Sequence, residues 1–177
     1  MSKTLKKLKF VGKLGKFLST LILIICTVAG LACAFVLVSL LLGNDGSVFI
    51  NGIKLIGVQV EGEITVGKIY LYTIEGIIAC GLEVISCLLS IKYFKNCLKN
   101  ETPFTIKSAD QLKVIGILEI VFQLVTQLCT YLASLGLNYL QMGAGKYNFS
   151  LSITLSLGLA LIVVSLICRY AAEQLEA

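Results

Sequence analysis

Four long apolar stretches dominate the pattern of hydrophobic and polar positions along the chain. They cover residues 17–42, 69–91, 114–137 and 149–167, and the only charges inside them are three glutamates. A helix that crosses a bilayer needs about 20 predominantly apolar residues. The pattern therefore predicts an all-α integral membrane protein, a four-helix transmembrane bundle that forms a single membrane domain over residues 1–177.

Composition agrees with this pattern. The chain is 57% hydrophobic and 14% charged, whereas a typical soluble domain is about 45–50% apolar and about 25% charged. The apolar run over 17–42 is longer than the core of a cleavable signal peptide, which has about 7–15 residues. We therefore expect the first helix to be retained and the lipid bilayer to be the main partner of the chain.

The basic residues predict an orientation. Of the 15 lysines and arginines, all but Lys54, Lys68 and Lys146 lie in 1–16, 92–113 or 168–177. Because basic loops stay in the cytoplasm, we expect a multi-pass protein of the cell (plasma) membrane with both termini cytoplasmic. Orientation explains these charges, so no nucleic-acid partner is expected. The basic segment before the first span could also form an interfacial helix on the inner leaflet.

The remaining segments, 43–68 and 138–148, are then external. In the first of them, Val48–Ile50 and 53–55 flank Asn51-Gly52, a pair that favours a two-residue hairpin turn. The stretch 58–66 alternates apolar and polar residues. We expect a small extracytoplasmic β-element of three or four short strands between helices 1 and 2. Glu61 and Glu63 would share its polar face, either solvated or as a cation or ligand site.

The cytoplasmic segment 92–113 carries helix-boundary signals and a resemblance. Pro103 predicts the end of a preceding helix, and Ser108 with Gln111 three residues later predicts a capping box at the start of the third helix. The stretch LKNETPFTIKSADQLKVIGIL (98–118) resembles the signature of a bacterial four-helix membrane family, domain of unknown function 2975. The matching residues are Pro103, Phe104, Leu112, Lys113, Ile115 and Gly116. The resemblance implies an envelope protein under regulation and implies no activity.

Polar residues inside two spans recur at helical spacing. One stripe contains Tyr72, Glu75, Ala79, Glu83, Ser86 and Ser90, and the other contains Gly116, Glu119, Gln123, Thr126, Thr130, Ser134 and Asn138 with Gln127 alongside. Such stripes turn away from lipid. The candidate intramembrane polar site is therefore Glu75, Glu83, Glu119, Gln123 and Gln127. We expect Glu83 and Glu119 to face each other, with at least one protonated because close carboxyls in low dielectric resist double ionisation. Gln123 or the second carboxyl would be the hydrogen-bond partner.

Two functional interpretations remain open. Hydrogen bonds among these polar groups could hold the bundle together in a non-enzymatic protein that acts by interaction, as a sensor, an accessory subunit or an envelope-stress or immunity factor. Its partner would be another membrane protein or a second copy of the chain. Alternatively, the buried glutamates could serve a small proton- or cation-coupled transporter or channel.

Enzymatic chemistry is not expected. The chain has no histidine, no HExxH or GxSxG motif, and aspartates only at 45 and 110. We predict no catalytic residues, no metal and no cofactor. The seven cysteines include no CxxC pair, and we interpret them as small packing residues. Acylation of Cys97 or Cys168 near a membrane surface is the alternative.

Overall fold

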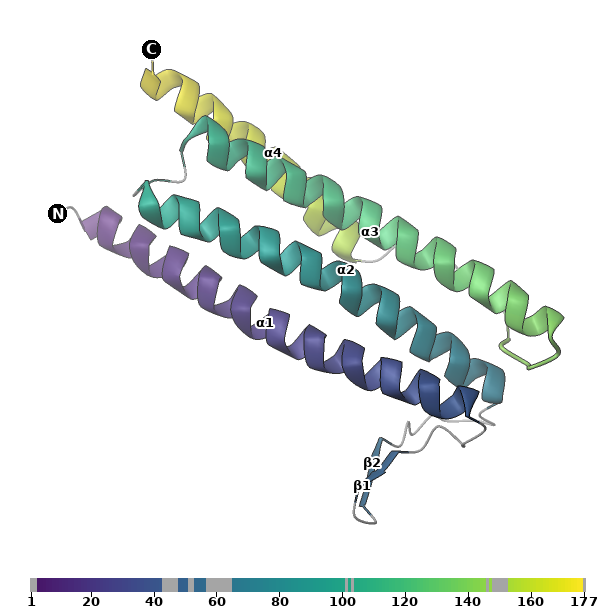
Figure 1. Cartoon of the computed structure of the whole chain (residues 1–177). Helices are drawn as coiled ribbons and strands as arrows, with labels where there is room; N and C mark the ends of the chain where they lie inside the picture. Colours follow the sequence, from purple (N-terminus) through teal and green to yellow (C-terminus); the bar gives the residue numbers. More distant parts are fainter. Residues whose placement is uncertain are drawn as a thin grey trace. The chain divides into compact units, whose positions relative to one another are not determined.

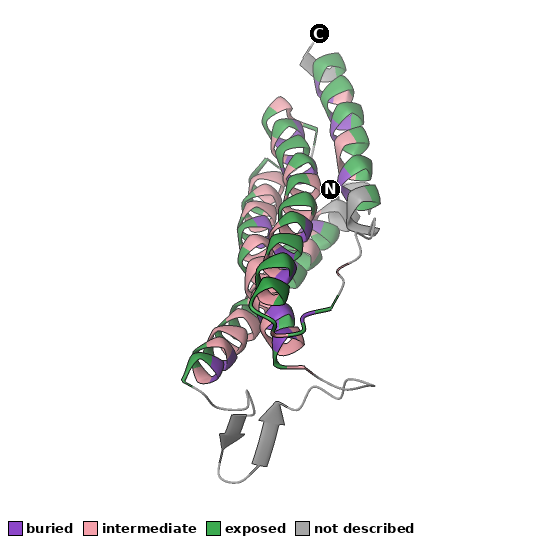
Figure 2. Cartoon of the chain, turned by 90° about the vertical axis from the view of Figure 1, so that its right-hand side faces the viewer, coloured by how far each residue is buried: buried purple, intermediate pink, exposed green. Residues whose placement is uncertain are grey.

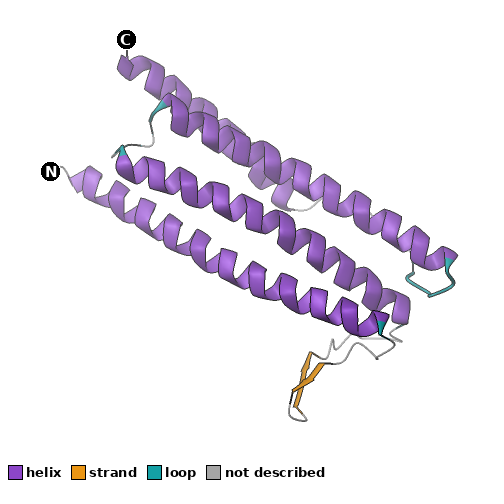
Figure 3. Cartoon of the chain, viewed as in Figure 1, coloured by secondary structure: helices purple, strands orange, loops and turns teal. Residues whose placement is uncertain are grey.

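Four helices make up most of the chain (Figures 1 and 3). The computed structural model describes residues 3–42, 48–50, 53–56, 65–100, 102, 104–145, 147 and 153–176. The helices are α1 (Lys3–Leu41), α2 (Val66–Lys99), α3 (Ile106–Tyr139) and α4 (Ile153–Glu176). Each contains a segment long and apolar enough to cross a membrane. The prediction of four such helices is confirmed, and the chain is a multi-pass membrane protein by this criterion.

Burial follows the pattern of a protein whose solvent is hydrocarbon. The largest fully buried side chains are polar ones, Thr130 and Ser108. Large apolar side chains lie outside instead: Phe17 is 63% exposed, Leu31 68% and Leu41 71%. Exposed and buried residues alternate around every helix in Figure 2. In water this arrangement would be unfavourable, because contiguous apolar surface is normally buried. Among lipid acyl chains the exposed apolar side chains carry no such cost.

The helices continue well beyond the apolar stretches from which they were predicted. α1 already begins at Lys3, and its Gly12 and Gly15 lie against Leu98 and Phe94 of α2. The prediction of a separate interfacial helix before the first span is therefore wrong. Hydropathy marks where the membrane core ends, but lysine is a good helix former, so the helix does not end there.

The same effect shortens the connection between the second and third helices. The segment 92–113 was expected to connect the two spans, with the third helix starting at Ser108, but α2 continues to Lys99 and α3 starts at Ile106. The cap of α3 is also shifted from the predicted Ser108. The backbone N–H of Ser108 donates to Oγ1 of Thr105 at 3.2 Å, and that hydroxyl donates to Oγ of Ser108 at 2.8 Å. Thr105 is thus the N-cap, and Ser108 occupies the third helical position.

The end of α3 is closed by a turn of the Schellman type. Gln141 has a φ of 58°, its N–H donates to the carbonyl of Asn138, and the N–H of Met142 donates to the carbonyl of Leu137. These two bonds are the ones that end a helix in this motif. The following residues return to the start of α2, where the N–H of Gly67 donates to the carbonyl of Met142 at 3.0 Å.

Two short strands lie between α1 and α2. β1 (Val48–Ile50) pairs antiparallel with β2 (Ile53–Ile56), with Ile50 opposite Ile53 and a register shift between Val48 and Phe49. Of the expected strand over 58–66, Val66 is helical instead. Asn51, Gly52, the rest of that strand with Glu61 and Glu63, and Pro103 lie outside the described residues. The location of the hairpin on the outer side of a membrane stays a prediction.

The contacts divide the chain into two compact units. The first unit consists of Met1–Cys26, Leu82–Leu124 and Leu151–Ala177, and the second of Thr27–Gly81 and Val125–Ser150. Small residues bring helices close together within each unit. In the second unit, a Cβ added at Gly30 would lie 3.3 Å from Cβ of Cys80, and one at Gly76 would lie 2.9 Å from Sγ of Cys33. Both thiols therefore fill space beside a glycine, and all seven cysteines are free.

Candidate functional site: the polar groups within the spans

The first unit contains the centre of the predicted polar site, where α2 meets α3. The hydroxyl of Ser86 hydrogen-bonds to Oε1 of Glu119, and Ser86 itself is only 3% exposed. One turn earlier on α2, Oε1 of Glu83 lies 4.0 Å from the buried thiol of Cys87. Glu83 and Glu119 are close enough for their charges to interact. The helical spacing thus does bring these two carboxyls together.

A close crossing of α3 and α4 helps to hold Glu119 in place. A Cβ added at Gly158 would lie 2.7 Å from Cγ1 of Ile120 and 2.8 Å from the carbonyl oxygen of Gly116. It would also lie 3.4 Å from Cβ of Glu119. Because only glycine allows this approach, α4 packs directly beside the residue that carries the carboxyl.

Gln123 does not take the part predicted for it. We expected its amide to bond to one of the carboxyls, but the partners are Ser86 for Glu119 and Cys87 for Glu83. Among the described residues, the half-buried Gln123 side chain has no hydrogen-bond partner. An amide in hydrocarbon gains from a hydrogen bond to a neighbouring helix or to water. Gln123 is therefore a polar group of this unit for which the described residues supply no partner.

The second unit contains the other two residues of the predicted site. Gln127 is 6% exposed and lies in the interior with the fully buried Thr130. Glu75 is half-buried and interacts electrostatically with the phenol of Tyr147, which also hydrogen-bonds with Thr130. Burial raises the pKa of the Tyr147 phenol, and the negative charge of Glu75 raises it further, whereas the hydrogen bond with Thr130 lowers it.

Sequence reasoning missed Tyr147, because it follows a glycine-rich turn outside every stripe. That turn is held to the end of α3 by two side chains. Oγ of Ser134 and Nδ2 of Asn138 both donate to the carbonyl of Gly145, at 3.2 and 2.8 Å. Ser134 and Asn138 were recognisable as members of the polar stripe. Their partner was not, because a backbone carbonyl in a turn has no signature in the sequence.

The stripes are only partly interior. Tyr72 and Ala79 belong to the same helical face of α2 as Glu75, yet Tyr72 is 54% exposed and Ala79 is exposed as well. Helical spacing fixes which residues share a face, but the width of the covered strip depends on how many neighbours pack against it.

This arrangement can form hydrogen bonds between helices and can exchange a proton or a cation. No group of three or more histidine, cysteine, aspartate or glutamate side chains is placed to hold a metal ion in the described part of the chain. The paired groups are carboxyl with hydroxyl and carboxyl with thiol.

Comparison with known proteins adds no further assignment. No protein-family model matches the sequence, and neither a curated protein nor a solved structure is similar to it. The geometry of the polar groups is therefore the basis on which a function can be proposed.

Proposed function

We propose that the protein is a non-enzymatic multi-pass membrane protein that acts by interaction, as a sensor, an accessory subunit or an envelope-stress or immunity factor. The asymmetric distribution of lysines supports a plasma-membrane location with both termini in the cytoplasm and the β1–β2 hairpin outside. The resemblance of 98–118 to a bacterial membrane family is compatible with this role.

The observation that carries the proposal is the contrast between Glu119 and Gln123 on α3. Glu119 has a hydroxyl partner supplied by α2, which favours a structural role for this carboxyl. Gln123, one turn further along the same helix, has none among the described residues. A partner helix that offers a hydrogen-bonding group would satisfy its amide, and such interhelical bonds contribute about 0.6–2 kcal/mol.

Amine-specific crosslinking in native membranes tests this proposal. Wild-type protein is expected to form a discrete species larger than the monomer. Gln123→Leu removes the amide but keeps a side chain of similar size, and should weaken that species by about 3- to 30-fold. Leu124→Ala is the matched control, because Leu124 is the next residue and is 53% exposed without a polar group. Recovery of monomer alone from wild-type membranes, or an equal effect of both variants, would contradict the proposal.

A second candidate function is proton- or cation-coupled transport, and Glu83 favours it. Within the described residues, the polar contact of its carboxyl is a thiol at 4.0 Å, which is at most a weak hydrogen bond. A carboxyl held this loosely beside a second one is suited to exchanging a proton or a cation. Flux through the reconstituted protein distinguishes this candidate from the first.

A further inference from the structure

A groove of about 600 Å³ lies between the last turns of α2 and the first turns of α3, within the first unit. Its apolar lining comes from both helices and includes Leu89, Val114 and Ile115. These residues belong to the segments that are apolar enough to cross a membrane. These apolar side chains are therefore suited to contact with a hydrocarbon chain.

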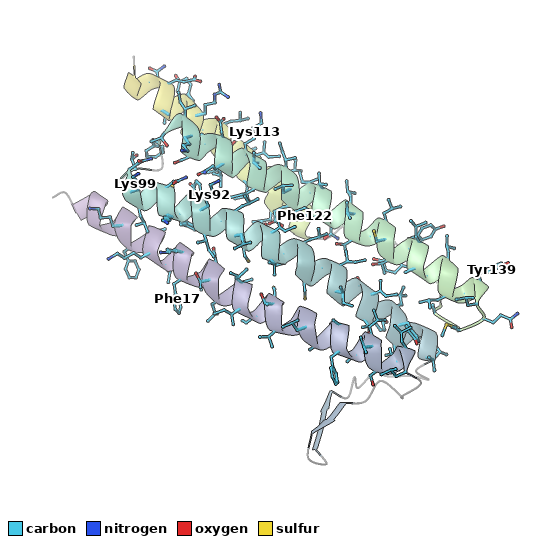
Figure 4. The ribbon with its side chains drawn as sticks, in the orientation of Figure 1. Phe17, Lys92, Lys99, Lys113, Phe122 and Tyr139 are labelled. Carbon is cyan, nitrogen blue, oxygen red and sulfur yellow. The ribbon has the colours of Figure 1, made fainter. Side chains whose placement is uncertain are left out.

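Cationic and hydrogen-bonding groups also line this groove. Lys92 of α2 and Lys107 of α3 are both exposed there, and Figure 4 marks Lys92 on α2. Gln111 accepts a hydrogen bond from Asn96 through Oε1 at 2.9 Å, and its amide N–H groups have no partner among the described residues. Two ammonium groups and an amide donor suit an anion.

One acidic residue also lines the groove, and its charge is partly compensated. Oδ1 of Asp110 lies 3.7 Å from Nη1 of Arg169, and Nε of the same arginine lies 3.0 Å from Oε1 of Glu173. With Lys92 and Lys107 opposing one paired carboxylate, the electrostatic balance in the groove is positive. Asp110 should weaken the binding of an anion without preventing it.

The length of the helices places this groove at the membrane boundary. α2 and α3 have 34 residues each, which corresponds to about 51 Å at 1.5 Å per residue. The hydrocarbon core is about 30 Å thick, so roughly 20 Å of helix lies in the headgroup regions or beyond. Lys92 is seven residues from the end of α2 and Lys107 is in the first turn of α3. Both can reach the phosphate level.

We propose that the groove binds an anionic phospholipid of the surrounding bilayer. Its phosphate lies beside Lys92 and Lys107, and an acyl chain lies along Leu89, Val114 and Ile115. Basic pockets between transmembrane helices are known to hold anionic lipid headgroups. A free phosphate would use the lysines and leave the apolar part of the groove empty, so the shape and the charge together favour the lipid.

Lipid titration of the full-length protein in neutral detergent tests the assignment, with the bound lipid counted by native mass spectrometry. Phosphatidylglycerol should bind more tightly than phosphatidylcholine with the same acyl chains. Lys92→Gln/Lys107→Gln should weaken the binding of phosphatidylglycerol about 25-fold, at roughly fivefold per lysine. Lys95→Gln/Lys99→Gln removes the same charge from exposed positions of α2 outside the groove, and should leave that binding unchanged.

Asp110→Asn should have the opposite effect on lipid binding from the two lysine substitutions. It removes the negative charge from the groove and should tighten the binding of phosphatidylglycerol, which a loss of folded structure could not do.

Three results would overturn the proposal. They are equal losses in the two lysine pairs, equal binding of the two lipids, and binding of inorganic phosphate as tight as that of phosphatidylglycerol.

Discussion

At the scale of single residues, the hydrogen bond between Ser86 and Glu119 is the polar contact that we expect to matter most for stability. It joins α2 to α3 at a place where Ser86 is buried and Glu119 is half-buried. Ser86→Ala leaves the carboxyl of Glu119 without its hydroxyl partner. We expect this change to lower the free energy of unfolding by about 0.6–2 kcal/mol, measured by titrating the purified protein from mild detergent into dodecyl sulfate.

Ser90 supplies the control for this measurement. It lies one turn further along α2 and is half-buried, and its hydroxyl has no hydrogen-bond partner among the described residues. Ser90→Ala should therefore leave the free energy of unfolding close to that of the wild type. If the two variants lose the same stability, the effect comes from helix packing at either serine and not from the bond to Glu119.

At the scale of helices, the crossing of α3 and α4 depends on two glycines. Gly158→Ala would bring a methyl group to 2.7 Å from Cγ1 of Ile120 and 2.8 Å from the carbonyl of Gly116. The helices would have to separate, and overpacking of this kind costs about 1–3 kcal/mol. The variant should unfold at a correspondingly lower dodecyl sulfate fraction than the wild type.

Gly136→Ala is the matched substitution on α3, because a Cβ added there meets no atom within 4 Å. Alanine favours helix over glycine by up to about 1 kcal/mol, so this variant should be as stable as the wild type or slightly more stable. A loss of stability at Gly136 equal to that at Gly158 would show that the close crossing is not the cause of the loss at Gly158, because a Cβ at Gly136 meets no neighbouring atom.

The helices also show what could be predicted from the sequence. The apolar stretches identified all four helices, because the requirement for about 20 apolar residues is strict. They predicted the helix ends poorly, because Lys9, Lys13 and Lys16 lie outside the apolar stretch but are still part of helix α1. Helical spacing brought Glu83 and Glu119 together correctly. It could not choose Ser86 over Gln123 as the partner of Glu119, because that choice depends on side-chain reach and on the rotation of α2 against α3.

At the scale of the whole molecule, the side on which each loop lies and the presence of a transport path are the properties that decide function. The four helices expose large apolar side chains along their length, and Tyr139 at the end of α3 (Figure 4) is 88% exposed. Every assay of the protein therefore requires a bilayer or detergent. Tyrosine at such a position is typical of the membrane–water interface. Measurements on the protein reconstituted in liposomes are therefore the relevant ones.

Proton and cation flux in proteoliposomes separates the two candidate functions at this scale. Under the interaction proposal, Glu119 is a structural group held by Ser86, so reconstituted wild-type protein should carry no flux above empty liposomes at any pH. Glu83→Gln/Glu119→Gln, which keeps the shape of both side chains and removes both ionisable groups, should be equally inactive.

Glu173→Gln is the control for removal of a carboxylate outside the site, since Glu173 is exposed and pairs with Arg169. A pH-dependent flux in the wild type that persists in Glu173→Gln and disappears in the double variant would overturn the interaction proposal. It would assign Glu83 and Glu119 to a transport pathway. A carboxyl that only forms a hydrogen bond between two helices would not exchange its proton with both sides of the membrane.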